Sequence, residues 1–266
     1  MIELFKYQFF QNAIIGGILI GILCAWVGLF LVLRKESMIV DGTAHTAFGG
    51  LALGMLLGID PFITAFIISI FSIFLINYMR SKKLAQSDSA IALMLAIGFS
   101  IGLIIISITK GFGIDLFIFL FGSILTISRE EIISISLITI FALIFLTIFQ
   151  RELLAIIFNE EEAKIMGIKV RPISICFNLI VATTIILSIK IVGVILVVAL
   201  IVIPALIVLR LNYSFFKTLI AAIIIALIGI IFGIIISVQF GISTSASIVF
   251  TLVLIYIISI LVKKKW

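Results

Sequence analysis

The segment Asp41-Gly-Thr-Ala-His45 places a carboxylate and an imidazole four residues apart, and His45 is the only histidine among the 266 residues. If this segment is helical, both side chains project from one helix face. Carboxylate and imidazole together can ligate Zn²⁺ or Mn²⁺. Two ligands are too few for a tight site, so we expect a second copy of the chain to contribute its own pair. The simpler alternative is an Asp–His pair at a helix N-terminus, where the helix dipole stabilises Asp41.

The same segment continues into a row of small residues, with Gly50, Gly54 and Gly58 at four-residue intervals. At about 100° per residue these glycines lie roughly opposite Asp41 on a helix. Small residues at this spacing allow two membrane helices to pack closely. The sequence therefore predicts one helix with ligands on one face and close packing on the other.

A second candidate site is the polar segment 158–168, which predicts a two-turn helix. Asn159 is a typical N-cap, Glu162 follows three residues later as in a capping box, and Gly167 is a typical C-terminal stop. Two turns are too few to be stable alone, so the helix must dock against something. It is either a capped surface turn or a coupling helix presented to a soluble partner. The residues assigned to coupling are Phe158, Asn159, Glu160, Glu161, Glu162, Ala163 and Gly167.

The elements that position these residues must be membrane helices. Of all residues 64% are hydrophobic and only 11% are charged, with a mean hydropathy of +1.51. A soluble domain is about half apolar and about a quarter charged, so a soluble fold is excluded. The cysteines, Cys24 and Cys176, both lie in apolar runs and are expected to be small buried hydrophobes.

Apolar runs long enough to cross a bilayer predict an all-α, polytopic transmembrane fold with eight or nine spans. The long runs are 9–33, 61–79, 89–109, 132–150, 172–189, 191–209, 216–238 and 244–262. Two shorter runs are 42–58, taken as a further span, and 113–127, taken as a partial or re-entrant segment. No repeat or linker divides residues 1–266, so we expect a single transmembrane domain.

The distribution of positive charge orients these spans. If 42–58 crosses, all of the 18 Lys and Arg residues except Lys6, Lys110, Arg129 and Lys190 fall on one side. The positive-inside rule assigns that side to the cytoplasm, which places the 151–171 loop inside and the N-terminus outside. The net charge of +6 is thus explained by topology, and we expect a lipid bilayer and no nucleic acid as its surroundings. If 42–58 does not cross, the N-terminus is inside.

Two further positions are candidates for helix bending and gating. Pro204 lies inside the run 191–209 and should kink that helix, because proline frees a backbone carbonyl. Gly193 lies near the start of the same run. No GxxxxGK[S/T] phosphate-binding loop occurs in these residues, so we expect no ATP site and no enzymatic activity in this chain.

These features together resemble the permeases of zinc-, manganese- and iron-uptake ABC transporters over nearly the full chain. Individually weak motifs occur in the family's order, at Arg34–Gly54, Ser87–Ile91, Phe121–Leu125, Phe158–Gly167, Val192–Leu196 and Ile203–Ala205. Three positions depart from the family pattern: Thr43 replaces a usual Ser, Ser123 replaces an acidic residue, and Asn159 replaces a usual Asp.

The resemblance implies a homodimeric permease of the cytoplasmic membrane that moves Zn²⁺, Mn²⁺ or Fe²⁺ by alternating access. It implies two further partners: a cytoplasmic ATP-binding subunit dimer and an extracytoplasmic metal-binding protein. Asp41 and His45 fall on the family's acidic-x-x-x-His positions, and Glu160 to Gly167 fall on its coupling segment. The metal is a substrate, and no permanently bound cofactor is expected.

Two alternatives remain open from the residues. One is a permease for an iron chelate or cobalamin, although such bulky ligands do not require an Asp–His pair. The other is an ion-coupled secondary transporter, which would need its own coupling-ion site. The Asp–His pair does not discriminate among Zn²⁺, Mn²⁺ and Fe²⁺, since it suits all three.

Overall fold

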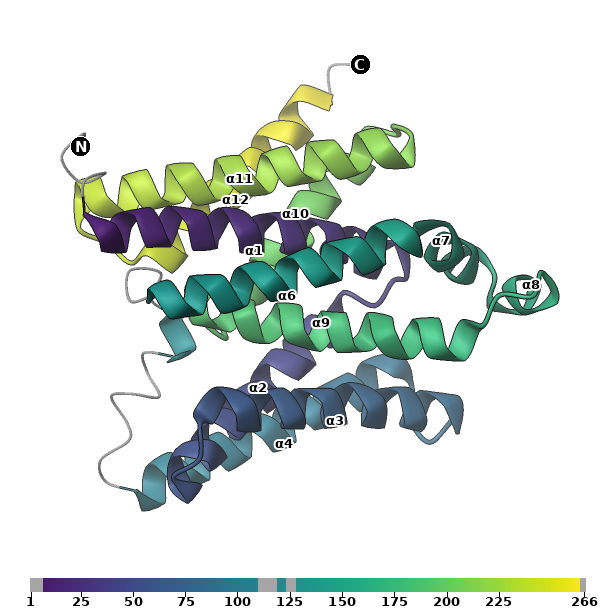
Figure 1. The fold of residues 1–266 in the computed structure, drawn as a ribbon, viewed down its shortest axis with the longest axis horizontal. Helices are drawn as coiled ribbons and strands as arrows, with labels where there is room; N and C mark the ends of the chain where they lie inside the picture. Colours follow the sequence, from purple (N-terminus) through teal and green to yellow (C-terminus); the bar gives the residue numbers. More distant parts are fainter. Residues whose placement is uncertain (1–6, 110–118, 123–127, 264–266) are drawn as a thin grey trace.

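The computed structural model describes residues 7–109, 119–122 and 128–263, and within these residues the chain is helical with short connections (Figure 1). The sequence prediction of an all-α membrane fold is therefore confirmed. The helices are α1 Gln8–Leu33, α2 Met38–Leu57, α3 Pro61–Ser81, α4 Ser87–Ile108, α6 Arg129–Ile148, α7 Gln150–Phe158, α8 Glu160–Ile165, α9 Val170–Val192, α10 Val197–Leu209, α11 Phe215–Phe240 and α12 Thr244–Lys263.

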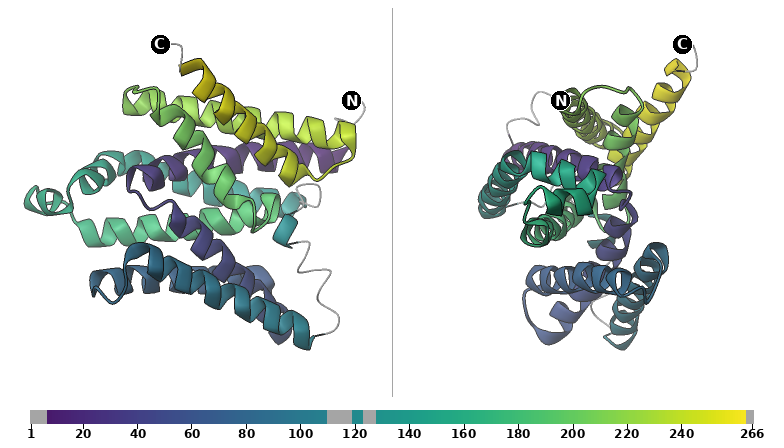
Figure 2. Two further views of the ribbon diagram at one scale, coloured as in Figure 1. Left: turned by 180° about the vertical axis from the view of Figure 1, so that it is seen from behind. Right: turned by 90° about the vertical axis from the view of Figure 1, so that its right-hand side faces the viewer.

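The helices form three neighbouring groups, which Figures 1 and 2 show from three directions. Helices α2, α3 and α4 pack against one another at one side of the molecule. Helices α1, α6 and α9 form the middle, and α10, α11 and α12 pack on the other side of α1. Helix α9 contacts α1, α2 and α3, so it lies between the first group and the rest.

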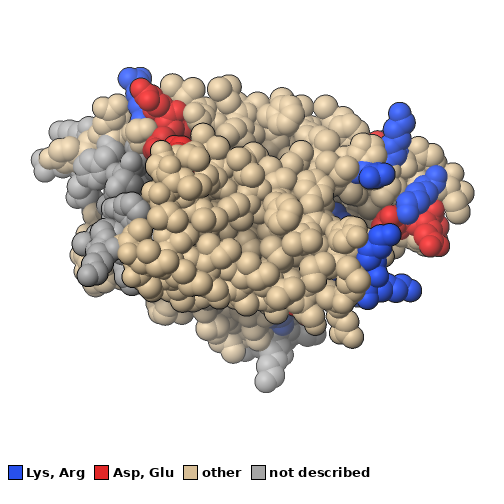
Figure 3. Space-filling view, turned by 90° about the horizontal axis from the view of Figure 1, so that it is seen from below, with Lys and Arg blue, Asp and Glu red and all other residues tan. Residues whose placement is uncertain are grey.

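Seven helices are long and apolar enough to cross a membrane. Helix α2 has 20 residues but is less apolar, and α10 has 13. With the seven they make nine of the eleven helices in the described residues, in line with the predicted eight or nine spans. Figure 3 shows charged side chains mainly at the two ends of the molecule, with an uncharged surface between them, as a membrane-spanning protein requires.

We call the end at which α7 and α8 lie the α8 end (Figure 1). The connections α1–α2, α3–α4, α8–α9 and α10–α11 also lie there, and α2 runs from this end to the opposite one. The described basic residues that these elements bring to the α8 end are Arg34, Lys35, Arg80, Lys82, Lys83, Arg151, Lys164, Lys169, Arg171, Arg210 and Lys217. This arrangement agrees with the predicted threading in which 42–58 crosses.

The expected span 191–209 starts too early, because α9 continues to Val192 and α10 begins only at Val197. Gly193 ends α9 with φ +84, a left-handed conformation that favours glycine. A Cβ there would lie 2.4 Å from the Leu120 carbonyl oxygen. Residues 119–121 are helical and pack into this break, where the Phe119 and Leu120 carbonyls accept hydrogen bonds from Val194 and Ile195. The rest of the predicted segment 113–127 lies outside the described residues.

Two details at the α8 end go beyond what the sequence predicted. The 151–171 connection contains a nine-residue helix, α7, that its composition did not reveal. The short helix predicted within segment 158–168 is α8, which covers Glu160–Ile165 directly after its cap Asn159. Phe158, at the start of that segment, is the last residue of α7.

Candidate functional site

Helix α2 holds the Asp41–His45 pair because it is clamped by glycine contacts on two sides. A Cβ on Gly50 would lie 2.7 Å from the Cα of Ala65 on α3, and one on Gly54 would meet Pro61. On the α4 side, a Cβ on Gly49 would lie 2.5 Å from the Gly98 carbonyl oxygen. Backbones this close fix the rotation of α2 about its axis. The predicted close packing of Gly50 and Gly54 is confirmed. Gly58 instead caps the helix with φ +67, and a Cβ added there would have no atom within 4 Å.

The structure brings Asp41 and His45 together on one face of α2. Asp41 lies in the first turn of the helix, and its Oδ1 is 3.6 Å from His45 Nε2. Both side chains keep some exposure, 30% for Asp41 and 18% for His45. An ion bonded to both atoms at about 2.0–2.2 Å would subtend an angle of roughly 110–130°, compatible with tetrahedral or similar coordination.

The surroundings of His45 are apolar and fix its ring. The imidazole and Phe99 of α4 pack in a T-shaped arrangement, with ring centroids 5.3 Å apart and planes at 90°. Its Nδ1 is buried and has no hydrogen-bond partner among the described residues, so Nε2 is the nitrogen that faces Asp41. The ring is thus held by packing, with one nitrogen directed at the carboxylate.

In the described part of the chain, Asp41 and His45 are not joined by a third ligand. No group of three or more His, Cys, Asp or Glu residues that could hold a metal ion occurs in the part of the chain that the structure describes. The expectation that a second copy adds its own Asp41 and His45 stays a prediction.

Pro204 is buried in α10, which continues past it to Leu209, so proline does not end this helix. A gating role for Pro204 and Gly193 also stays a prediction.

The second candidate site, α8, projects from the molecule beyond α7 and α9 (Figure 1). The Asn159 side chain caps the helix by accepting hydrogen bonds from the Glu161 and Glu162 amides, as predicted. Glu162 bonds the Asn159 side chain at 2.7 Å instead of the backbone, so the reciprocal half of the capping box is absent. Glu160 pairs with Lys164 at 2.7 Å.

The other end of α8 closes with a glycine. Gly167 has φ +83, and the Ile168 amide donates back to the Ala163 carbonyl, which is the hydrogen bond of a Schellman ending. Ala163 is the one residue of α8 that is buried. The structure therefore anchors α8 through Ala163 and leaves its acidic face exposed.

Large apolar side chains surround this acidic face, and the sequence analysis singled out only one of them. Phe158, Ile165 and Met166 are 84%, 86% and 75% exposed. Adjacent exposed apolar side chains at a polar surface mark a protein-interaction site.

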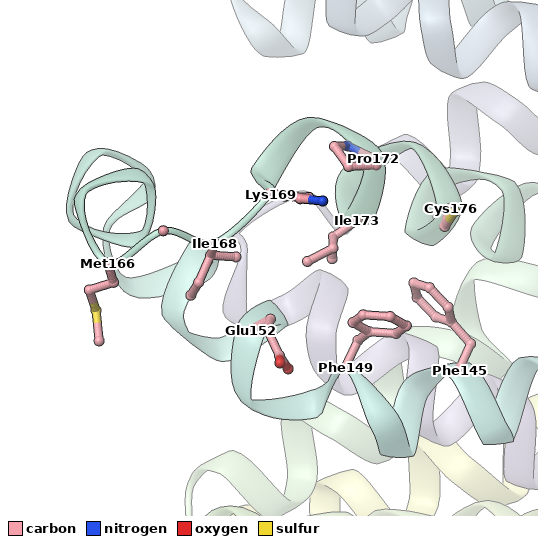
Figure 4. A pocket seen from close by; sticks show the side chains of 10 residues that line it. Phe145, Phe149, Glu152, Met166, Ile168, Lys169, Pro172, Ile173 and Cys176 are labelled. Carbon is pink, nitrogen blue, oxygen red and sulfur yellow. The ribbon is translucent and has the colours of Figure 1, made fainter.

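A hollow of about 620 Å³, which Met166 helps to line, lies between α9 and the helices α6 and α7. Figure 4 shows Phe145, Phe149 and Ile173 on its walls, with Glu152 and Lys169 among its polar groups.

Comparison with known proteins gives a consistent result over most of the chain. The family model of the ABC 3 transport family matches residues 6–263. The manganese import system permease protein ScaB of Streptococcus gordonii is 36% identical over 168 residues, which cover 63% of this chain and 60% of ScaB. The manganese transport system membrane protein MntC of Halalkalibacterium halodurans is 29% identical over 71% of this chain and 64% of its own length. The matched segments thus span less than two thirds of both relatives.

The fold itself is similar to a solved structure. A chain of PsaBC from Streptococcus pneumoniae in complex with Fab superimposes with a TM-score of 0.86 at 29% sequence identity. The similarity covers 96% of this chain and 92% of that one.

Proposed function

The chain belongs to the ABC 3 transport family, and from this premise we propose that it is the permease subunit of an ABC importer for a divalent transition-metal ion. As a multi-pass membrane protein it would work by alternating access at the interface of two copies. ATP would be hydrolysed by a separate cytoplasmic subunit, since these residues contain no phosphate-binding loop. An extracytoplasmic binding protein would deliver the metal.

One observation carries the proposal: Asp41 and His45 share a face of a helix whose position is fixed by backbone contacts. Ionisable residues inside a membrane protein are costly and mark substrate or ion pathways. The proposal is supported by the similarity to ScaB, a manganese import permease protein, and to MntC, a manganese transport membrane protein. It takes Mn²⁺, Zn²⁺ and Fe²⁺ as candidate substrates.

The exposed α8 supplies the second part of the proposal. Phe158, Ile165 and the glutamates of α8 form a surface that this chain leaves uncovered. We assign it to contact with the ATPase subunit, so that ATP binding moves α8 and, through α9, the body of the permease. The predicted cytoplasmic side of the α8 end agrees with this partner.

The test is transport by the assembled complex of permease, ATPase and binding protein in proteoliposomes. We expect uptake of a radioactive divalent metal that requires ATP and is reduced by competing Mn²⁺, Zn²⁺ or Fe²⁺. Uptake driven by an ion gradient without ATP would instead indicate a secondary transporter. Uptake of an iron chelate or cobalamin in place of the free ion would indicate a chelate permease, and either result would overturn the proposal.

A further inference from the structure

A buried carboxylate, Glu36, lies between two arginines at the α8 end, two residues before α2 begins. Glu36 is 8% exposed. Its Oε2 is 3.0 Å from Arg34 Nε and its Oε1 is 2.7 Å from Arg80 Nη1. Each carboxylate oxygen therefore has its own guanidinium partner. Neither Glu36 nor Arg80 was singled out by the sequence analysis.

The backbone around Glu36 joins the end of α1 to the start of α2. The Glu36 amide donates to the Leu31 carbonyl, and its own carbonyl accepts from the Ile39 amide in the first turn of α2. Lys35, which lies between the end of α1 and Glu36, has a positive φ of 57°. The main chain of Glu36 thus belongs to the ending of one helix and the beginning of the next. A shift of this residue would shift the first turn of α2, where Asp41 lies.

The two arginines connect Glu36 to other helices. Arg80 lies in the last turn of α3, which packs on α2 along Gly50 and Gly54. Arg34 also lies over the ring of Phe177 on α9, with its Cζ 5.3 Å from the ring centroid. Helix α9 starts five residues after α8 ends. A continuous set of contacts therefore runs from α8 along α9 to Arg34, Glu36 and α2.

We propose that Glu36 is a positioning residue that couples movement of α9 to the helix that carries Asp41 and His45. This inference rests on the proposed function, because it assigns Glu36 to the transfer of movement from the ATPase contact to the metal pair. Its charge is essential to the role, since a neutral residue would leave two partly buried guanidinium groups without a counter-charge. The α2–α3 pair would then lose its ionic link to Arg34, the residue that contacts Phe177 of α9.

The chain offers a matched control for this ion pair. Glu131, in the first turn of α6, pairs with Lys190 of α9, whose ammonium lies 4.5 Å from the ring centroid of Phe62 on α3. This second cluster lies at the end opposite α8 and has no bond to α2 among the described contacts. Glu131→Gln removes the same kind of charge from a pair outside the proposed set of contacts.

The experiment measures metal uptake and ATP hydrolysis in the same proteoliposomes, with the full complex. For Glu36→Gln we expect ATP hydrolysis close to that of the parent complex and about tenfold less metal imported per ATP, a coupling change of typical allosteric size. For Glu131→Gln we expect the parent ratio. A parent ratio in Glu36→Gln, or an equal loss in both variants, would overturn the inference.

A second variant covers the case in which Glu36→Gln does not assemble. Arg80→Gln removes one of the two contacts and leaves the Arg34–Glu36 pair, so we expect a smaller loss of metal imported per ATP. If Arg80→Gln keeps the parent ratio, Glu36 does not act through α3 and the inference fails. The parent complex reports separately on the proposed function: absence of ATP-driven metal uptake there removes the premise itself.

Discussion

The two candidate sites, α2 and α8, are held in place by opposite means. Helix α2 is fixed from outside, because glycines on two of its faces meet the backbones of α3 and α4. Helix α8 is fixed from within, by the Asn159 cap and the Gly167 turn, with one buried residue under it. A substitution at one of these glycines must therefore change the fold around α2. A substitution in α8 can change a surface and leave the fold intact.

The largest effect that separates the two sites should come from Gly98→Leu on α4. A Cβ at Gly98 would lie 2.4 Å from the Cα of Thr46 and 2.6 Å from the His45 carbonyl oxygen. Because backbone cannot move aside as a side chain can, we expect a loss of about 3 kcal/mol or more of stability, beyond ordinary overpacking. Thermal unfolding in detergent measures it.

The control is Gly58→Asn at the end of α2. Gly58 has open space around it and a left-handed conformation that asparagine tolerates. We expect at most about 1 kcal/mol of destabilisation. If both variants unfold at the parent temperature, the glycine contacts do not hold α2.

The next effect concerns the surface of α8. The double substitution of Phe158 and Ile165 to Ser should leave thermal unfolding unchanged, because both side chains are exposed. It should weaken binding of the ATPase subunit by about 30-fold, as expected when interface anchors are truncated. Affinity is measured on the detergent-solubilised permease with purified ATPase.

The matched control is Ile59→Ser in the α2–α3 connection. Ile59 is also exposed, but at the end opposite α8. We expect ATPase affinity equal to that of the parent protein. Equal weakening by both sets of substitutions would remove α8 from the ATPase interface.

The smallest effect should come from Asn159→Ala, which removes the cap of α8. The Glu161 and Glu162 amides would lose their acceptor, at a cost of about 1 kcal/mol confined to this helix. We expect faster hydrogen exchange of these amides and no change in global unfolding. Unchanged exchange would show that α8 does not depend on its cap.

The comparison also explains what could be predicted from the sequence. The caps of α8 are local, so Asn159 and Gly167 revealed both ends of the helix. Gly50 and Gly54 revealed a packing face because they recur at helical spacing. The contact of Gly98 on α4 with Gly49 and Thr46 could not be predicted, since contacts between distant segments leave no mark on a single sequence.

The same limit applies to Glu36 and Arg80, which are 44 residues apart and meet only through the fold. Hydropathy joined residues 191–209 into one span because the break at Gly193 is as apolar as its flanks. The break between α9 and α10 is explained only by the close approach of residues 119–122 to Gly193 and Val194. The charge count, in contrast, predicted the arrangement of the helix ends, because it depends only on where Lys and Arg lie along the chain between the apolar runs.

The central claim is that Asp41 and His45 lie on the path of a transported metal ion, and the direct test is ATP-driven uptake by a His45→Ala complex. His45 is mostly buried beside Phe99, so correct assembly is first checked by ATPase binding. Asp88→Asn is the control, because Asp88 is an exposed acid in the first turn of α4. We predict that His45→Ala loses metal uptake while Asp88→Asn transports like the parent complex. Normal metal uptake by an assembled His45→Ala complex would contradict the account.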